Sequence, residues 1–169
     1  MNRVDSVIID QQAIQSIILA DDDRDDHDFF KTALQEIDPT KKLNIVTDGA
    51  QLLALLEHYV PDLIFLDLDM PCKNGLECLK EIRTNTVLHN LPVVVFSSTS
   101  RPANITTAYE MGGNLFFIKP SNYNDLVAAI RSILSMDWSN PNAIKEKYLV
   151  ENSYAPFSVE KPGTSAAAT

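Results

Sequence analysis

Four short hydrophobic runs in this chain each end in a charged or hydroxyl-bearing residue, and this pattern restricts the fold more than any other feature. The runs are Ile17-Ile18-Leu19-Ala20 before Asp21, Leu63-Ile64-Phe65-Leu66 before Asp67, Val93-Val94-Val95-Phe96 before Ser97, and Leu115-Phe116-Phe117-Ile118 before Lys119. Apolar runs of this length followed by turn residues are typical of buried parallel strands. Ligands bind beyond the carboxyl ends of such strands, so we expect the four polar residues to meet at one edge of a sheet.

Amphipathic helical patterns separate these runs. Strands are expected at 17–20, 43–46, 63–68, from 92 and at 115–118, and helices at 25–37, 50–58, from 75, at 102–111 and at 124–136. The alternation of strand and helix, five times over, predicts an α/β fold. We expect a five-stranded parallel sheet, doubly wound, with helices on both faces.

The length of 169 residues suits one domain with short appendages. We expect a leader at 1–15, a domain at 16–137 and a flexible tail at 138–169. The tail contains Pro141, Pro156 and Pro162 and ends in small residues, so at most one helical turn is expected there, near 143–149.

Composition and charge exclude several functions. The formal net charge of -9 and the lack of a basic stripe argue against nucleic-acid binding. No apolar stretch is long enough to span a membrane, and the N-terminus does not resemble a signal peptide. Cys72 and Cys78 have no histidine partner nearby, so we expect reduced thiols in a cytoplasmic protein rather than a zinc or disulfide site.

Six of the eight residues from Asp21 to Asp28 are aspartates. Aspartate is favoured near a helix N-terminus, which accounts for Asp25, Asp26 and Asp28. It accounts poorly for Asp21 and Asp22, because they directly follow a strand. A calcium loop is excluded, since its sixth position would need glycine and is Asp26, and its twelfth would need glutamate and is Thr32.

Asp67 would bring a third carboxylate to the same sheet edge. Two carboxylates about 4 Å apart repel by roughly 4 kcal/mol at a surface-like dielectric, unless a cation lies among them. Oxygen ligands favour Mg²⁺ over zinc. A carboxylate can also accept a phosphoryl group, a transfer that needs cations and alignment more than covalent help. Lys119 would supply a positive charge, and Ser97 a hydroxyl donor.

These segments resemble the receiver domain of response regulators in two-component signalling. The similar segments are Ile18-Leu19-Ala20-Asp21-Asp22-Asp23, Pro61 to Pro71 with Asn74-Gly75, Pro92 to Ser98, and Phe116-Phe117-Ile118-Lys119-Pro120. The similarity covers about residues 16–137 and implies the flavodoxin-like receiver fold with strand order 2-1-3-4-5.

The resemblance also implies a role for each site residue. Asp67 would be the phosphoacceptor. Asp21, Asp22 and Asp67 would hold Mg²⁺ together with the backbone carbonyl of Asp69. Lys119 would bind the phosphate, Ser97 would be the switch hydroxyl and Phe116 the switch aromatic. Two features depart from the usual pattern: the acidic side chain of Asp69 would repel an incoming phosphoryl group, and Phe116 lacks the hydroxyl of a tyrosine.

The expected protein is a single-domain, chemotaxis-receiver-like regulator that catalyses only its own phosphorylation and dephosphorylation. Its expected partners are a histidine kinase or histidine phosphotransfer protein and a downstream protein target. A homodimer through the face of the fourth helix, fifth strand and fifth helix is a further expectation. The change of charge on phosphorylation would bias this face between two states.

Two alternatives remain open at this point. A haloacid-dehalogenase-type phosphatase also forms an aspartyl-phosphate, and Asp67-Leu68-Asp69 resembles its nucleophile motif. That motif usually lies on the first strand, however, and Pro71 occupies a position where threonine or valine is usual. The other alternative is a receiver used without phosphorylation, purely as a binding module.

Overall fold

A five-stranded parallel sheet forms the centre of the molecule, which the computed structural model describes for residues 13–159. The strands are β1 (Ser16–Ala20), β2 (Lys42–Val46), β3 (Leu63–Leu66), β4 (Val93–Ser97) and β5 (Leu115–Ile118). Their order is β2-β1-β3-β4-β5, and all neighbouring pairs are parallel. Every residue of β3 and β4 is buried, as expected for strands covered on both faces. The predicted fold class is confirmed.

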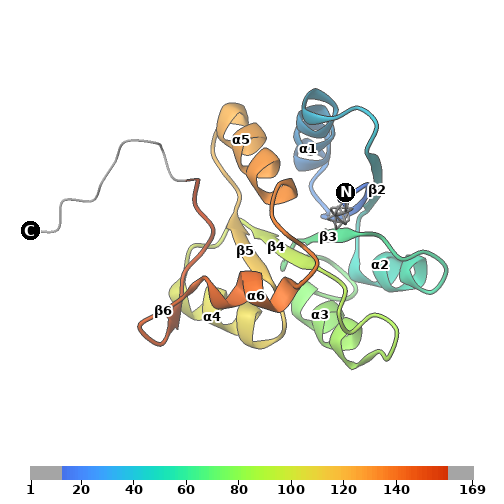
Figure 1. Cartoon of the computed structure of the whole chain (residues 1–169). Coiled ribbons are helices and arrows are strands. Elements are labelled where there is room, and N and C mark those ends of the chain that lie inside the picture. The colour runs from blue at the N-terminus through green and yellow to red at the C-terminus, as the bar shows by residue number, and fades with distance from the viewer. Residues whose placement is uncertain (1–12, 160–169) are drawn as a thin grey trace, which may run out of the picture.

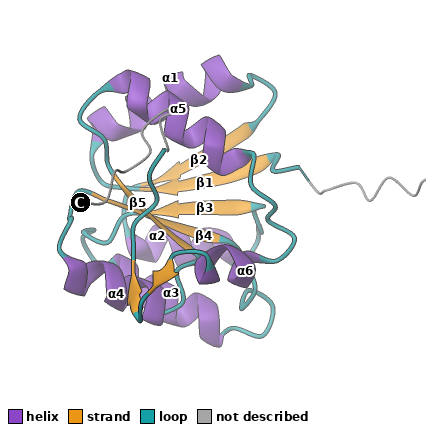
Figure 2. Ribbon diagram, turned by 60° about the vertical axis from the view of Figure 1, so that its left-hand side comes forward, coloured by secondary structure: helices purple, strands orange, loops and turns teal. Residues whose placement is uncertain are grey.

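The helices cover the sheet on both sides (Figures 1 and 2). They are α1 (Arg24–Ile37), α2 (Gly49–Leu56), α3 (Gly75–Thr84), α4 (Pro102–Glu110) and α5 (Tyr123–Leu134). Figure 2 shows α1 and α5 above the sheet and α2, α3 and α4 below it. Polar residues begin most of these helices: the side chain of Asp23 caps α1 and that of Asp48 caps α2. Each cap satisfies a backbone N–H that would otherwise lack a partner.

Two apolar layers hold the helices to the sheet. Under α1 and α5, the rings of Phe30 and Phe65 meet edge to face with their centroids 4.8 Å apart, and Phe96 joins them. On the opposite face, Leu52 of α2 and Leu79 of α3 are fully buried. Such edge-to-face ring pairs add to the stability gained from burial alone. The sheet edge that carries the polar residues therefore rests on a rigid support.

The segment after Asp137 is not the flexible tail that the sequence suggested, at least as far as residue 159. It forms a short helix, α6 (Pro141–Glu146), and a small hairpin of β6 (Leu149–Val150) and β7 (Ser153–Tyr154). Trp138, Ile144 and Phe157 bury their side chains in the same apolar layer as α1 and α5. These three anchors are far apart in the sequence, so no helical or strand periodicity reveals them.

This C-terminal segment, residues 138–159, closes the outer edge of β5. The N–H of Phe157 donates to the carbonyl of Phe116 at 2.7 Å. The hydroxyl of Tyr109 on α4 accepts a bond from the N–H of Phe116 at 3.0 Å and donates to the carbonyl of Ala155 at 3.1 Å. In Figure 1, α6 lies beside α4. The outward-facing N–H and carbonyl of Phe116, on an edge strand, are thus paired within the chain.

Small differences from the predicted elements concern their ends. The third strand stops at Leu66 instead of continuing to Leu68, because the carbonyl of Leu68 accepts a bond from the N–H of Gly75. The predicted leader at 1–15 lies almost entirely outside the described residues, although Ile14 is buried. Among residues 13–159, no helix combines the length and apolarity needed to cross a membrane.

Candidate functional site

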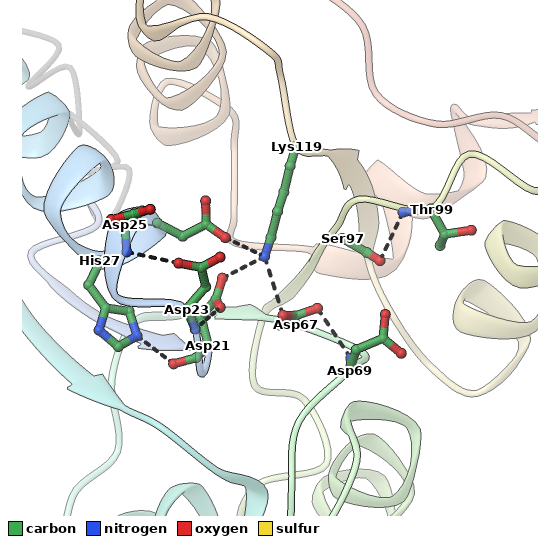
Figure 3. A network of polar contacts seen from close by, with 10 residues as sticks. Asp21, Asp23, Asp25, His27, Asp67, Asp69, Ser97, Thr99 and Lys119 are labelled. Atoms are coloured by element: carbon green, nitrogen blue, oxygen red, sulfur yellow. Dashed lines mark hydrogen bonds and ion pairs between the residues drawn. The ribbon is translucent and has the colours of Figure 1, made fainter.

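The carboxyl ends of β1, β3, β4 and β5 bring four of the predicted residues to one edge of the sheet (Figure 3). Asp21 follows β1, Asp67 follows β3, Ser97 ends β4 and Lys119 follows β5. The strand register places Asp21 level with Asp67, since Ala20 lies opposite Leu66. Ser97 and Lys119 lie one and two residues further along, since Leu66 is opposite Val95 and Ser97 is opposite Ile118. The N–H of Asp67 also donates to the carbonyl of Ala20 at 2.9 Å. The convergence predicted from the strand ends is therefore present in the structure.

Three carboxylates form a group that could hold a metal ion. One oxygen from each of Asp21, Asp22 and Asp67 lies within 4.8 Å of the others. Asp21 is fully buried and Asp67 is 5% exposed, whereas Asp22 is exposed. The Oδ2 atom of Asp21 is buried, and among the described residues it lies 2.8 Å from the ammonium of Lys119 as an ion pair. Three crowded carboxylates, two of them buried, make a purely oxygen donor set that fits a hard divalent cation such as Mg²⁺.

Lys119 reaches into this group with its ammonium. Its Nζ lies 2.8 Å from Oδ2 of Asp21 and 3.2 Å from Oδ2 of Asp67. Its shortest contact, at 2.7 Å, is with Oδ2 of Asp26. Burial alone would lower the pKa of Lys119, but its close contacts with the carboxylates of Asp21 and Asp26 and the charge of Asp67 outweigh burial and raise that pKa above its usual value. The ammonium is therefore a permanent positive charge in the site.

The carboxylate of Asp67 is held in an unfavourable place for a negative charge. Burial raises its pKa to about 6, the charge of Lys119 opposes that rise, and the charge of Asp21 adds to it. Burial likewise raises the pKa of Asp21, against the opposing effect of Lys119. Two buried carboxylates next to each other repel, so a further cation would stabilise both in their ionised forms. This crowding matches the expectation drawn from the sequence.

The loop after β3 fixes the orientation of Asp67. The N–H of Asp69 donates to Oδ1 of Asp67 at 3.2 Å, and the side chain of Asp69 is exposed (Figure 3). Gly75 returns close to this loop: a Cβ there would lie only 2.2 Å from the carbonyl oxygen of Asp67. Any residue larger than glycine would push that backbone away. Asn74 then caps α3 through a reciprocal pair of bonds with Glu77.

The two predicted switch residues are both buried. Ser97 is fully buried, and its hydroxyl accepts a bond from the N–H of Thr99 at 3.3 Å rather than a contact with Asp67. Phe116 is fully buried against Ile105, Ala108 and Tyr109, next to α4. Figure 3 shows Ser97 close to Asp67, at the end of its strand. A rearrangement would be needed before either residue could respond to a group bound at Asp67.

Sequence reasoning missed three residues of this region. Asp26 was explained by its place in the first turn of α1, but it bonds Lys119. The ring of His27 contacts the carbonyl of Asp21 through Nε2 at 2.5 Å. Tyr109 connects α4, β5 and the C-terminal segment. Only for Asp26 was there a usable signal: its turn of helix directly follows the strand end that carries Asp21 and Asp22.

Together these groups offer a nucleophile with its electrostatic support. A carboxylate oxygen of Asp67 can attack an electrophilic phosphorus, and Lys119 can neutralise the charge that arrives with the phosphoryl oxygens. The carboxylates around it can hold a divalent cation.

Comparison with known proteins identifies close similarities. Residues 17–131 match the family model of the response regulator receiver domain. Response regulator Rcp1 from Synechocystis sp. is 31% identical over 126 residues, which are 70% of this chain and 86% of Rcp1. The transcriptional regulatory protein CpxR from Klebsiella pneumoniae is 35% identical over 136 residues, 79% of this chain. The chain spans only about half (55%) of the length of CpxR.

Solved structures agree with these sequence matches. The phosphorylated cyanobacterial phytochrome response regulator RcpA superposes with a TM-score of 0.69 at 30% identity, covering 75% of this chain and 96% of RcpA. The Mn²⁺-bound form of Rcp1 superposes with a TM-score of 0.66 at 30% identity, covering 74% of this chain and 95% of Rcp1. In each case nearly the whole of the solved chain is matched, whereas about a quarter of the present chain is not.

Proposed function

Because the chain belongs to the response regulator receiver family, we propose that it accepts a phosphoryl group on Asp67 and signals through phosphorylation-dependent protein contacts. The observation that carries this proposal is the meeting of Asp21, Asp67 and Lys119 at one sheet edge, with Nζ of Lys119 2.8 and 3.2 Å from the two carboxylates. The donor is a histidine kinase or a histidine phosphotransfer protein, and the target is another protein.

The transfer is a displacement at phosphorus. An oxygen of ionised Asp67 forms a P–O bond while the P–N bond of a phosphohistidine breaks, and the imidazole leaves with a proton taken from solvent. Lys119 draws the transferred oxygens towards its ammonium, and the Ser97 hydroxyl donates to another of them. The buried position of Asp67 excludes most bulk water, which strengthens these interactions.

We propose Mg²⁺ as the cofactor. Asp21, Asp22 and Asp67 would hold it with the backbone carbonyl of Asp69, and the crowding of these three carboxylates, two of them buried, supports this assignment. When bound, Mg²⁺ supplies positive charge to the phosphoryl oxygens. A solved relative, Rcp1, has a form described as Mn²⁺-bound, which is consistent with a divalent-cation site in the family.

The signal would leave the site through Ser97 and Phe116. Movement of Ser97 towards the phosphoryl group would free space for Phe116, which is now packed against α4. The face formed by α4, β5 and α5 would change in consequence. A homodimer through this face has to accommodate the C-terminal segment, which pairs with β5 and touches α4. We place the protein in the cytoplasm, where its free cysteines would stay reduced.

Mass spectrometry after treatment with acetyl phosphate and Mg²⁺ tests the proposal. We expect one phosphoryl group per chain, located on Asp67, and none after chelation of the metal or in Asp67→Asn. The matched control is Asp28→Asn, which removes an exposed aspartate of α1 and should label normally.

Three outcomes would contradict the proposal. Steady turnover of a phosphomonoester would indicate a phosphatase instead. A chain that takes up no phosphoryl group, yet still binds its target, would indicate a binding module. Label on a residue other than Asp67 would show that the acceptor is misassigned.

A further inference from the structure

The ammonium of Lys119 has three protons and three carboxylates within reach. Its two hydrogen bonds go to Asp26 at 2.7 Å and to Asp67 at 3.2 Å, and Asp21 lies at 2.8 Å as an ion pair. The shorter hydrogen bond therefore belongs to Asp26, a residue outside the group that could hold a metal. Figure 3 shows Lys119 extended from the end of its strand to the acidic residues, with its Nζ between them and Asp67. The proposed phosphotransfer gives no reason for the shortest hydrogen bond of Lys119 to go to Asp26.

Asp26 differs from the other two partners of Lys119. Asp21 and Asp67 are buried and lie in the group of three carboxylates that could share a cation. Asp26 lies in the first turn of α1 and its side chain is 27% exposed. A cation bound near Asp21 and Asp67 would compensate their negative charges and so weaken their attraction for Lys119. The attraction between Asp26 and Lys119 would remain.

We infer that Asp26 is a positioning residue that holds Lys119 in the unphosphorylated protein and competes with the phosphoryl oxygens for its ammonium. This inference rests on the proposed function. Each N–H of Lys119 can donate to one acceptor, so a phosphoryl oxygen can gain a good hydrogen bond only when a carboxylate gives one up. The partner to be displaced is Asp26, because it is the least buried of the three and lies outside the group of carboxylates that could share a cation.

The solvent exposure of the Lys119–Asp26 ion pair limits how much it can weaken the binding of a phosphoryl group. A partly exposed lysine–carboxylate pair contributes about 1 kcal/mol at most, which corresponds to about a fivefold change in an equilibrium constant. Removing the charge of Asp26 should therefore strengthen binding of a phosphoryl mimic by about fivefold. The effect should shrink with added salt, because the carboxylate of Asp26 is accessible to solvent.

Binding of beryllofluoride to the full-length chain in Mg²⁺, followed by calorimetry, tests the inference. We expect Asp26→Asn to bind beryllofluoride about fivefold more tightly than the unchanged protein. Asp26→Glu retains the charge and should bind close to the unchanged protein. Asp28→Asn removes an exposed aspartate of the same helix that does not contact Lys119, and should leave the affinity unchanged.

A second measurement separates this role from a general effect on the fold. Nuclear magnetic resonance of the Lys119 side chain should show a clear shift between the unchanged protein and Asp26→Asn before beryllofluoride is added. The two proteins should give nearly the same Lys119 signal once beryllofluoride is bound, because the lysine then donates to fluorine in both. A purely structural role for Asp26 would leave a difference in both states.

Different results would contradict the proposed function and the role assigned to Asp26. If the unchanged protein binds no beryllofluoride in Mg²⁺, the proposed function is wrong. If it binds beryllofluoride but Asp26→Asn binds equally or less tightly, the role assigned to Asp26 is wrong while the proposed function stands.

Discussion

At the scale of single residues, the site is defined by charges that the fold forces together. Asp67 is 5% exposed and Asp21 is fully buried. Burial raises the pKa of both carboxyl groups, and the charge of Asp21 further raises the pKa of Asp67. Lys119 offsets part of this repulsion but is shared with Asp26. The site is therefore less stable without an added cation than an uncharged arrangement of the same shape would be.

This crowding predicts a pH-dependent gain in stability for Asp67→Asn. The pKa of Asp67 rises from 3.8 to about 6 on folding, so between these values the folded chain binds more protons than the unfolded chain. The contribution of Asp67 to the free energy of unfolding thus falls as the pH rises through this window, and it remains unfavourable above it. In metal-free buffer, Asp67→Asn should be more stable than the unchanged protein by about 2 kcal/mol near pH 8, and by less near pH 5.

Urea denaturation in a chelator, near pH 8 and again near pH 5, measures this difference. Asp28→Asn serves as the control. The carboxylate of Asp28 is exposed on α1, so its removal should change the free energy of unfolding little at either pH. A loss of stability in Asp67→Asn near pH 8 would contradict the prediction. It would mean that the bond between Lys119 and Asp67 outweighs burial and repulsion.

At the scale of elements, Tyr109 ties three parts of the chain together. Its hydroxyl lies between the N–H of Phe116 on β5 and the carbonyl of Ala155 after β7. Its ring stacks on Tyr154 with the centroids 4.6 Å apart. The carbonyl of Tyr109 also accepts a bond from Nζ of Lys145 on α6 at 2.6 Å. One residue of α4 therefore fixes both β5 and the C-terminal segment.

Tyr109→Phe removes only the hydroxyl and should destabilise the protein by about 1–3 kcal/mol. The reason is that a buried N–H and a carbonyl lose their partner while the ring still fills its place. Tyr123→Phe is the matched control: its hydroxyl bonds the exposed Glu36, so its loss should cost less than about 1 kcal/mol. Chemical denaturation of both variants compares the two costs. Equal small effects would indicate that water replaces the Tyr109 hydroxyl at no cost.

At the scale of the whole molecule, the C-terminal segment completes the fold. The family model ends at residue 131, but burial continues to Ile144 and Phe157. The ring of Phe157 packs edge to face on Phe117 at 5.9 Å, and its backbone pairs with β5. Without this segment β5 would present an open edge, which is a ready template for pairing with another chain.

A chain that ends at Asn140 keeps Trp138, which follows α5, but loses the rest of the segment. We expect it to be less stable by on the order of 2–3 kcal/mol, because two large apolar anchors are lost while some chain entropy is regained. It should also self-associate more than the full chain in light scattering. A chain that ends at Val159 retains every described contact and is the control. Equal stability and an equal degree of self-association for the two shortened chains would show that the segment contributes nothing to the fold.

Much of the fold and of the site follows from the sequence. The strands after which Asp21, Asp67 and Lys119 stand are uninterrupted apolar runs, so both their burial and their parallel pairing are encoded locally. The meeting of these residues then follows from the geometry of a parallel sheet. The role of each residue came from resemblance to a family, and it remains a proposal until phosphorylation is measured.

The sequence by itself therefore determined the α/β architecture and the sheet edge at which the carboxylates and the lysine gather. Only the tertiary structure decided that Lys119 bonds Asp26, 93 residues away, and that Tyr109 bonds Ala155, 46 residues away. It also decided that residues 138–159 pack on the domain. Periodic patterns encode which face of a helix or strand is buried, but contacts between distant polar side chains depend on the relative placement of whole elements and leave no local pattern.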